Sequence, residues 1–337
     1  MTSALYAEET PALDPVAVSL RGKPIPVTAF KSVDISSDGK YVAAGNGEGK
    51  LFLWDLERQE LLQNNQVHEN WTFDVHFSPD GKRLATAGGD NLTFILPMQN
   101  DLFSIRLGGH TEDVHGVRFF NNSNRLVTGG DDKNVRIWNL DQQKSDLLEG
   151  HTLQVTAVAI NKNDTLIASA SRDKSIRLWD PETLTEVGLL EGHTADVLSV
   201  DFSKPTKEDP EYLVSASYDK TVRIWDVKAN TVLKTFDSFE DWVFAARFDP
   251  AGKWLAIGVG NGDFTIRNWK TDDLIFQHKF PHDISGIDFS DTGDQVVVST
   301  SGGHVYLSKM LQGFWIEPVE LPLSKPTSIP RKQNSSN

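Results

Sequence analysis

The sequence predicts an all-β protein assembled from seven copies of one four-stranded unit. One residue pattern returns along most of the 337 residues at intervals of about 40 to 45 positions. Within each copy, apolar residues alternate over short runs that turn residues separate, which is typical of strands. The sequence contains no long amphipathic helical pattern. Together these observations indicate a fold built by stacking small sheets.

The repeated pattern is clearest in the middle of the chain. Residues 110–139, 151–180 and 193–226 each begin with the His of a Gly-His pair, continue through an alternating apolar run to a Ser or Thr and then an Asp, and close on Trp-Asp or Trp-Asn. The same frame extends less completely to both sides. It predicts seven closing positions, spaced 39 to 46 residues apart: Trp54, Leu96, Trp138, Trp179, Trp225, Trp269 and Ser308.

Inside one copy, the alternation predicts short strands that are apolar on both faces. In the fourth copy these are residues 155–160, 166–169 and 176–178, with turn signals at Asn163-Asp164 and Asp173-Lys174. Sheets with two apolar faces must pack against other sheets. Radial stacking of seven four-stranded antiparallel sheets buries every face without leaving long exposed edges. We therefore expect a seven-bladed β-propeller.

From about residue 20 to residue 310 the chain resembles the WD-repeat proteins, because Gly-His, Asp and Trp-Asp recur in phase three times. The resemblance implies a single propeller domain over residues 20–322. It leaves an N-terminal extension at residues 1–19 and a C-terminal tail at residues 323–337, which its Pro, Ser, Lys and Arg content predicts to be disordered.

The signature is incomplete in the outer copies. Pro26 and Glu48 replace the His and the Asp of the first copy, Leu96 replaces the Trp of the second, and Phe239 replaces the His of the sixth. The seventh copy has lost nearly all of the pattern. In WD-repeat proteins an N-terminal strand usually completes the last blade.

Three segments are candidates for that closing strand. Residues 16–20 and 23–27 lie on the N-terminal side, and residues 313–321 offer the same strand from the C-terminal side. The sequence does not choose among them.

The composition excludes several chemistries. The chain has no cysteine, so disulfides, zinc–thiolate sites, iron–sulfur clusters and a cysteine nucleophile are excluded. Its 33 basic and 47 acidic side chains give a net charge of −14, which makes nucleic acid an unfavourable partner. We find neither a secretory signal nor an apolar run that could span a membrane. We expect a cytoplasmic protein, or a nuclear one in a eukaryote.

A His, a hydroxyl and an Asp that recur inside a propeller resemble a catalytic triad. The set occurs three times, however, and an enzyme does not need three copies of one active site. The WD-repeat resemblance instead implies a buried hydrogen-bond chain from Asp through His and Ser or Thr to the Trp indole, in which each polar group satisfies its neighbour. The three structural chains are His110, Thr128, Asp132 and Trp138; His151, Ser169, Asp173 and Trp179; and His193, Ser215, Asp219 and Trp225.

Motifs for catalysis and cofactor binding are absent from the sequence. It has no Gly-x-Ser-x-Gly elbow, no His-Glu-x-x-His zinc motif and no phosphate-binding loop. The glycine clusters at residues 45–49 and 258–262 fall where turns between strands are expected, and tight turns need glycine. We therefore expect no catalytic residues, no cofactor and no metal.

The WD-repeat resemblance also implies a partner-binding face. It carries the Gly-His loops and the Asp turns, and the positions three and five after the His, and one before the Asp, point into it. The main candidates are Trp71, Phe73, Asp113, His115, Asp131, Arg172, Asp196, Tyr218, Trp242 and Phe244, and the same offsets add Gly89, Gln154, Thr156, Leu198, Gly262, Asp283 and Ser285.

The chemistry of these candidates suggests what a partner presents. Aromatic side chains are frequent interface hot spots, and carboxylates beside them favour a basic side chain. Trp71 and Trp242 have an alternative role, which is to fill the core where the repeated chains are broken. The first hypothesis predicts a peptide or loop with a basic residue next to an apolar one.

We predict a non-enzymatic protein-interaction scaffold that acts as a subunit of a larger complex. The alternative is an enzyme or small-ligand binder that uses the central channel, for which Asp113, His115 and Asp131 form the one close titratable set. The chain lacks the Trp-Asp-x-Arg pattern that resembles cullin-ligase substrate receptors, which disfavours that role. An insertion at residues 204–210 is expected to form a solvated loop on the opposite face.

Overall fold

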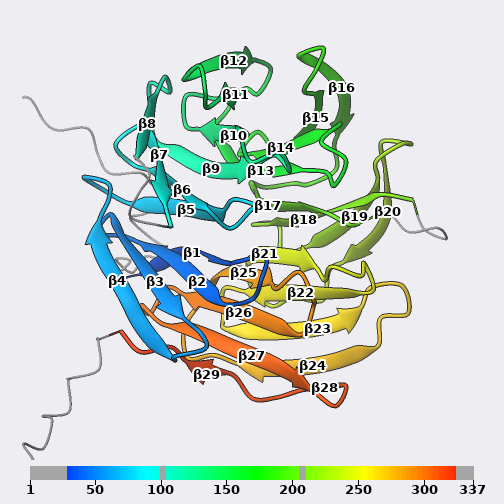
Figure 1. The fold of residues 1–337 in the computed structure, drawn as a ribbon. Helices are drawn as coiled ribbons and strands as arrows, with labels where there is room; N and C mark the ends of the chain where they lie inside the picture. Colours follow the sequence, from blue (N-terminus) through cyan, green and yellow to red (C-terminus); the bar gives the residue numbers. More distant parts are fainter. Residues whose placement is uncertain (1–28, 99–103, 205–209, 324–337) are drawn as a thin grey trace, which may run out of the picture.

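Alternating apolar residues make each copy of the repeat a four-stranded antiparallel sheet, and seven such sheets are arranged around one axis (Figure 1). The computed structural model describes residues 29–98, 104–204 and 210–323. The predicted all-β, seven-bladed propeller is confirmed. Within the described ranges, no helix is long and apolar enough to cross a membrane. The candidate closing strands at residues 16–20 and 23–27 lie outside the described residues.

The strands follow the sequence in order, four to a blade, from the innermost to the outermost. The first three blades are β1 (Phe30–Ile35), β2 (Tyr41–Asn46), β3 (Lys50–Asp55) and β4 (Glu60–Gln66); β5 (Thr72–Phe77), β6 (Arg83–Gly88), β7 (Leu92–Pro97) and β8 (Ile105–Gly108); and β9 (Val114–Phe119), β10 (Arg125–Gly130), β11 (Val135–Asn139) and β12 (Lys144–Leu148).

The remaining four blades keep this order. They are β13 (Val155–Ile160), β14 (Ile167–Ser171), β15 (Ile176–Asp180) and β16 (Thr185–Leu190); β17 (Val197–Phe202), β18 (Tyr212–Ser217), β19 (Val222–Asp226) and β20 (Thr231–Phe236); β21 (Val243–Phe248), β22 (Trp254–Val259), β23 (Asp263–Asn268) and β24 (Leu274–Lys279); and β25 (Ile284–Phe289), β26 (Gln295–Thr300), β27 (Val305–Leu311), β28 (Phe314–Trp315) and β29 (Val319–Glu320).

The hydrophobic core lies between neighbouring blades. In blade 4, Trp179 pairs with Ile167 across the sheet and packs into a buried cluster that includes Phe120 and Ile137 of blade 3. The apolar strand faces therefore meet the next blade rather than solvent. This packing fixes the inner strands in a ring, in which β1 packs against both β5 and β25.

The C-terminal segment supplies the outer strand of blade 7. That strand is split into β28 and β29, and both pair with β27. Beyond β29, the Leu321 amide donates a hydrogen bond to the Val305 carbonyl over 2.8 Å, and the Leu321 side chain is buried among Phe30 and Trp54 of blade 1. Of the three candidate closing segments, residues 313–321 occupy this place in the structure.

One closing position differs from the sequence alignment of the copies. In blade 3 the register joins Leu126 to Trp138, whereas in blade 6 it joins Leu255 to Arg267. Arg267 therefore occupies the Trp position of blade 6, and the assignment of Trp269 to it was wrong. The cause is that Trp269 lies just beyond β23, where its indole donates to the Gly252 carbonyl over 2.9 Å.

Candidate functional site

The repeated His, hydroxyl, Asp and Trp residues form continuous buried hydrogen-bond chains. In blade 3, His110 Nδ1 lies 2.9 Å from Asp132, His110 Nε2 lies 2.7 Å from Thr128 Oγ1, and the Trp138 indole donates to the same hydroxyl over 2.8 Å. One tautomer satisfies every group: Nδ1–H donates to the carboxylate, Nε2 accepts from the hydroxyl, and the hydroxyl oxygen accepts from the indole.

The same chain recurs in two further blades. In blade 4, His151 lies 2.8 Å from Asp173 and 2.7 Å from Ser169, which accepts from Trp179 over 2.8 Å. In blade 5 the distances among His193, Asp219, Ser215 and Trp225 are the same, in the same order. Blade 2 retains His68 between Asp90 and Thr86, each at 2.8 Å, but has Leu96 where the indole would be.

Burial and hydrogen bonding shift the pKa of three members of these chains. Burial raises the pKa of the Asp173 carboxyl, but hydrogen bonds from His151 and Ser175 outweigh burial, so the pKa lies well below its ordinary value. Hydrogen bonds from His193 and Thr221 likewise outweigh burial and lower the pKa of the Asp219 carboxyl. Burial lowers the pKa of His193, only partly opposed by Asp219. The lowered pKa favours the neutral imidazole of His193, which fits a hydrogen-bond link that donates from Nδ1 and accepts at Nε2.

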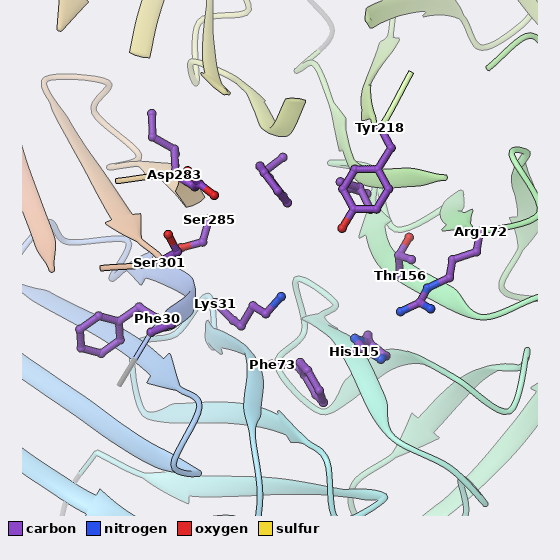
Figure 2. A pocket seen from close by; sticks show the side chains of 14 residues that line it. Phe30, Lys31, Phe73, His115, Thr156, Arg172, Tyr218, Asp283, Ser285 and Ser301 are labelled. Atoms are coloured by element: carbon purple, nitrogen blue, oxygen red, sulfur yellow. The ribbon is translucent and has the colours of Figure 1, made fainter. Parts of the chain in front are cut away.

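At one end of the central channel the inner strands surround a cavity of about 120 Å³ (Figure 2). Each of the seven blades contributes one residue to its wall, from the second position of its inner strand: Lys31, Phe73, His115, Thr156, Leu198, Phe244 and Ser285. Arg172, Tyr218 and Ser301, from turns between second and third strands, add to the wall. We call this cavity and its wall the mouth.

A backbone hydrogen bond fixes each of these turns to the start of the inner strand of its own blade. The amide of Arg172 donates to the Gln154 carbonyl over 3.0 Å, and the amide of Tyr218 donates to the Asp196 carbonyl over 3.0 Å. In blade 6 the corresponding donor is Gly260, bound to the Trp242 carbonyl. Gly262 was therefore the wrong residue for this position, for the same reason that Trp269 was misaligned.

The structure brings half of the ten main candidate residues to the wall of the mouth. Phe73, His115, Arg172, Tyr218 and Phe244 line the cavity, whereas Trp71, Asp113, Asp131, Asp196 and Trp242 lie outside its lining. Trp71 is only 7% exposed, and its ring stacks on Phe73 with centroids 5.8 Å apart. Its burial matches the alternative role, that of filling the core.

A cluster of three aromatic rings lies on the opposite side of the mouth from Trp71. The Tyr218 ring centroid lies 4.7 Å from that of Trp242 and 5.7 Å from that of Phe244, the latter pair meeting edge to face. All three residues are half-buried, so they keep accessible ring surface. We call these three residues the aromatic cluster.

Two carboxylates beside the mouth contact residues that line it. The Nε atom of Arg172 lies 4.0 Å from an Asp196 oxygen, and Nε2 of His115 lies 2.9 Å from an Asp131 oxygen. Burial raises the pKa of the Asp196 carboxyl, and the charge of Arg172 opposes that rise. The ligand atoms of Asp113, His115 and Asp131 lie within 4.8 Å of one another, a spacing that a divalent cation would accept but that the His115–Asp131 contact also explains.

Sequence reasoning missed Lys31. Its ammonium lies 5.6 Å from the centroid of the Trp71 ring, a cation–π distance, and its side chain reaches into the mouth (Figure 2). A signal for it exists, because Lys31 follows Pro26 by five residues, the same offset that predicted Phe73 and Phe244. The missing His in the first copy had hidden that offset.

The other end of the channel is lined by charged side chains, and three of its carboxylates bind the backbone of a neighbouring blade. A cavity of about 250 Å³ there is lined by Asp34, Arg118, Asp201, Arg247 and Asp288 among others. The carboxylates accept backbone N–H groups of the following blade: Asp34 from Phe77 over 2.7 Å, Asp201 from Phe248 over 2.9 Å, and Asp288 from Ile35 over 3.0 Å. These groups are therefore engaged in holding neighbouring blades together.

The comparison with protein families agrees with this geometry. The model of the family described as WD domain, G-beta repeat matches residues 19–55, 59–95, 102–139, 142–180, 184–226 and 230–270. The chain belongs to the WD-repeat family. The six matches end before blade 7. That blade is recognised by its strand order and pairing instead. No curated protein matches the sequence.

Proposed function

We propose that this WD-repeat protein is a non-enzymatic scaffold whose mouth and aromatic cluster bind a peptide or loop of another protein. The observation that carries the proposal is the ring of seven inner-strand residues that surrounds one open cavity, with accessible aromatic surface beside it. WD-repeat propellers commonly bind proteins. Half-buried aromatic rings on a rigid ring of strands give large contact area at small entropic cost.

The chemistry around the mouth favours a partner with a basic residue next to an apolar one. Asp113, Asp131 and Asp196 lie beside the mouth, where their carboxylates attract Lys or Arg of a partner. The aromatic cluster offers a surface for the apolar residue. Membership of a larger complex and a cytoplasmic or nuclear location stay predictions.

Affinity purification with mass spectrometry tests the proposal, using the full chain as bait. The bait with Tyr218→Ala and Phe244→Ala should lose a partner that the wild type retains. The matched control is Phe314→Ala, because Phe314 is 78% exposed on β28, away from the mouth. Circular dichroism and thermal melting establish that each bait is folded. Partners retained equally by all baits would place binding elsewhere.

An enzyme or small-ligand binder is the second candidate, supported by the close set of Asp113, His115 and Asp131 at the mouth. Such an activity needs convergent groups that act on one substrate. A screen of the purified protein for hydrolase turnover, with His115→Ala as the comparison, tests it. Turnover by the wild type that His115→Ala abolishes would favour this candidate over the scaffold.

A further inference from the structure

The mouth carries a different charge at its centre from the charge beside it. Among the described residues that line the cavity, Lys31 and Arg172 are basic and Asp283 is the one acid. Asp113, Asp131 and Asp196 lie outside that lining. The lining therefore carries two basic groups and one carboxylate, with three further carboxylates around it, on a chain whose net charge is −14.

The two basic side chains approach the same space from different walls. Figure 2 shows the Lys31 ammonium and the Arg172 guanidinium pointing toward each other across the cavity, with the Tyr218 hydroxyl directed into the same space. Lys31 comes from β1, and Arg172 follows β14. Side chains from blades 1, 4 and 5 thus direct N–H and O–H donors into the same cavity.

Each basic group is held in place by a neighbour. Trp71 lies beneath the Lys31 ammonium at 5.6 Å, and Asp196 lies 4.0 Å from Arg172 Nε. A guanidinium has five N–H donors in a planar fork, and an ammonium has three. Positioned donors of this kind suit a ligand that accepts hydrogen bonds and carries negative charge.

The size and surroundings of the cavity limit the negative charge that its ligand can carry. About 120 Å³ admits a small group rather than a folded element, and the walls at Phe73, Leu198 and Phe244 are apolar enough to contact methylene groups. Asp283 and the three carboxylates around the lining outnumber Lys31 and Arg172. A phosphate, which carries close to two negative charges, is therefore repelled more strongly by the site as a whole than the single charge of a carboxylate. An acidic side chain fits these conditions better than a phosphorylated one.

We propose that the mouth recognises the carboxylate of a Glu or Asp side chain on the bound peptide, inserted between Lys31 and Arg172. The inference rests on the proposed function, since it names the central residue of the peptide bound there. The basic residue of the peptide then lies outside the centre, against Asp113, Asp131 or Asp196, and the apolar residue lies on the aromatic cluster.

Selection from a library of displayed random nonapeptides against the full-length protein tests the inference. We expect the selected sequences to share one acidic position flanked by basic and apolar residues. A synthetic fluorescent peptide with the selected sequence is then compared by fluorescence polarisation with versions carrying Gln, Lys or phosphoserine at the acidic position. The Gln version should bind wild-type protein about tenfold more weakly.

Charge reversal in the protein provides the matched test. Lys31→Glu should weaken binding of the acidic peptide and make the Lys version bind more tightly relative to it. Arg172→Gln should weaken binding of the acidic peptide about tenfold. Lys162→Glu is the control, because Lys162 is an exposed residue in the turn between the first two strands of blade 4, on the opposite face. It makes the same change of charge and should leave every peptide unaffected.

The outcomes separate this inference from the proposed function. If Tyr218→Ala weakens the selected peptide but replacing its acidic residue by Gln changes nothing, the acidic-residue inference is wrong and the scaffold proposal stands. Tighter binding of the phosphoserine version would overturn the choice of a carboxylate. If no peptide is selected, the inference is overturned, and if in addition no protein partner depends on Tyr218 and Phe244, the scaffold proposal fails too.

Discussion

The indole of Trp54 donates a hydrogen bond to the Pro322 carbonyl over 2.7 Å, although 268 positions separate the two residues. Trp54 belongs to blade 1 and Pro322 follows the last strand of blade 7. In blades 3 to 5 the equivalent indole donates to a Ser or Thr of its own blade. Blade 1 lacks that chain, and its indole is instead used to join the two ends of the described ring.

This junction predicts that a single leucine supports ring closure. Leu321 is 6% exposed in the blade 1 core, so Leu321→Ala removes buried surface and should lower the free energy of unfolding by about 2–4 kcal/mol. The matched control is Leu323→Ala, because Leu323 is 40% exposed. Thermal and urea unfolding measure both. Equal effects of the two substitutions would show that closure does not depend on this contact.

A second prediction concerns the chain in blade 4. Asp173→Ala leaves His151 and the amide of Thr152 without their acceptor, and should lower the free energy of unfolding by about 1–3 kcal/mol. The melting temperature at neutral pH measures this loss. An unchanged melting temperature would contradict the structural role assigned to the chain.

The same carboxylate predicts how that loss changes with pH. The pKa of Asp173 is lower in the folded protein than its ordinary value, so its contribution is complete above about pH 4 and is lost as the pH falls toward the folded pKa. The difference in melting temperature between the wild type and Asp173→Ala should therefore shrink below about pH 4. A difference that stays constant down to pH 3 would contradict the lowered pKa.

A third prediction has the opposite sign, because it concerns a raised pKa. Burial raises the pKa of Asp288 to about 6, while the Ile35 amide and Arg247 oppose the rise, and burial together with the charge of Asp288 raises the pKa of Asp34 as well. Folding therefore favours the protonated carboxyl. Stability from this group is present below about pH 4 and is lost as the pH rises to about 6.

Asp288→Asn tests this sign, since the amide oxygen can still accept the Ile35 N–H while carrying no charge. The variant should melt at a higher temperature than the wild type at pH 7.5, and the difference should vanish near pH 4. Asp291→Asn is the control, because the Asp291 side chain is 61% exposed. A variant less stable than the wild type at pH 7.5 would contradict this sign and show that the charge itself is needed, through Arg118 and Arg247.

The fold could be predicted because each blade carries its own signature. The Gly-His, Asp and Trp of one copy lie within about 30 residues of one another, so the pattern reports the structure of a single blade. The regular spacing of the copies then predicts blade 7, where the pattern itself is nearly lost. Arg267 could not be placed, because the closing position of blade 6 lost its Trp while Trp269 stood two residues away. The burial of Trp71 depends on contacts with Ala29 of a different blade, which an offset along the sequence does not report.

That burial leads to the last prediction, which separates a core aromatic residue from an accessible one. Trp71→Ala removes an indole that packs on Ala29 and Phe73 and lies beneath Lys31, and should cost about 3–5 kcal/mol of stability. Trp242→Ala should cost less, because Trp242 is half-buried and packs chiefly on Tyr218 and Phe244. Urea unfolding measures both. If Trp71→Ala unfolds as the wild type does, the ring is not part of the core, and a direct role in partner binding becomes the better account of it.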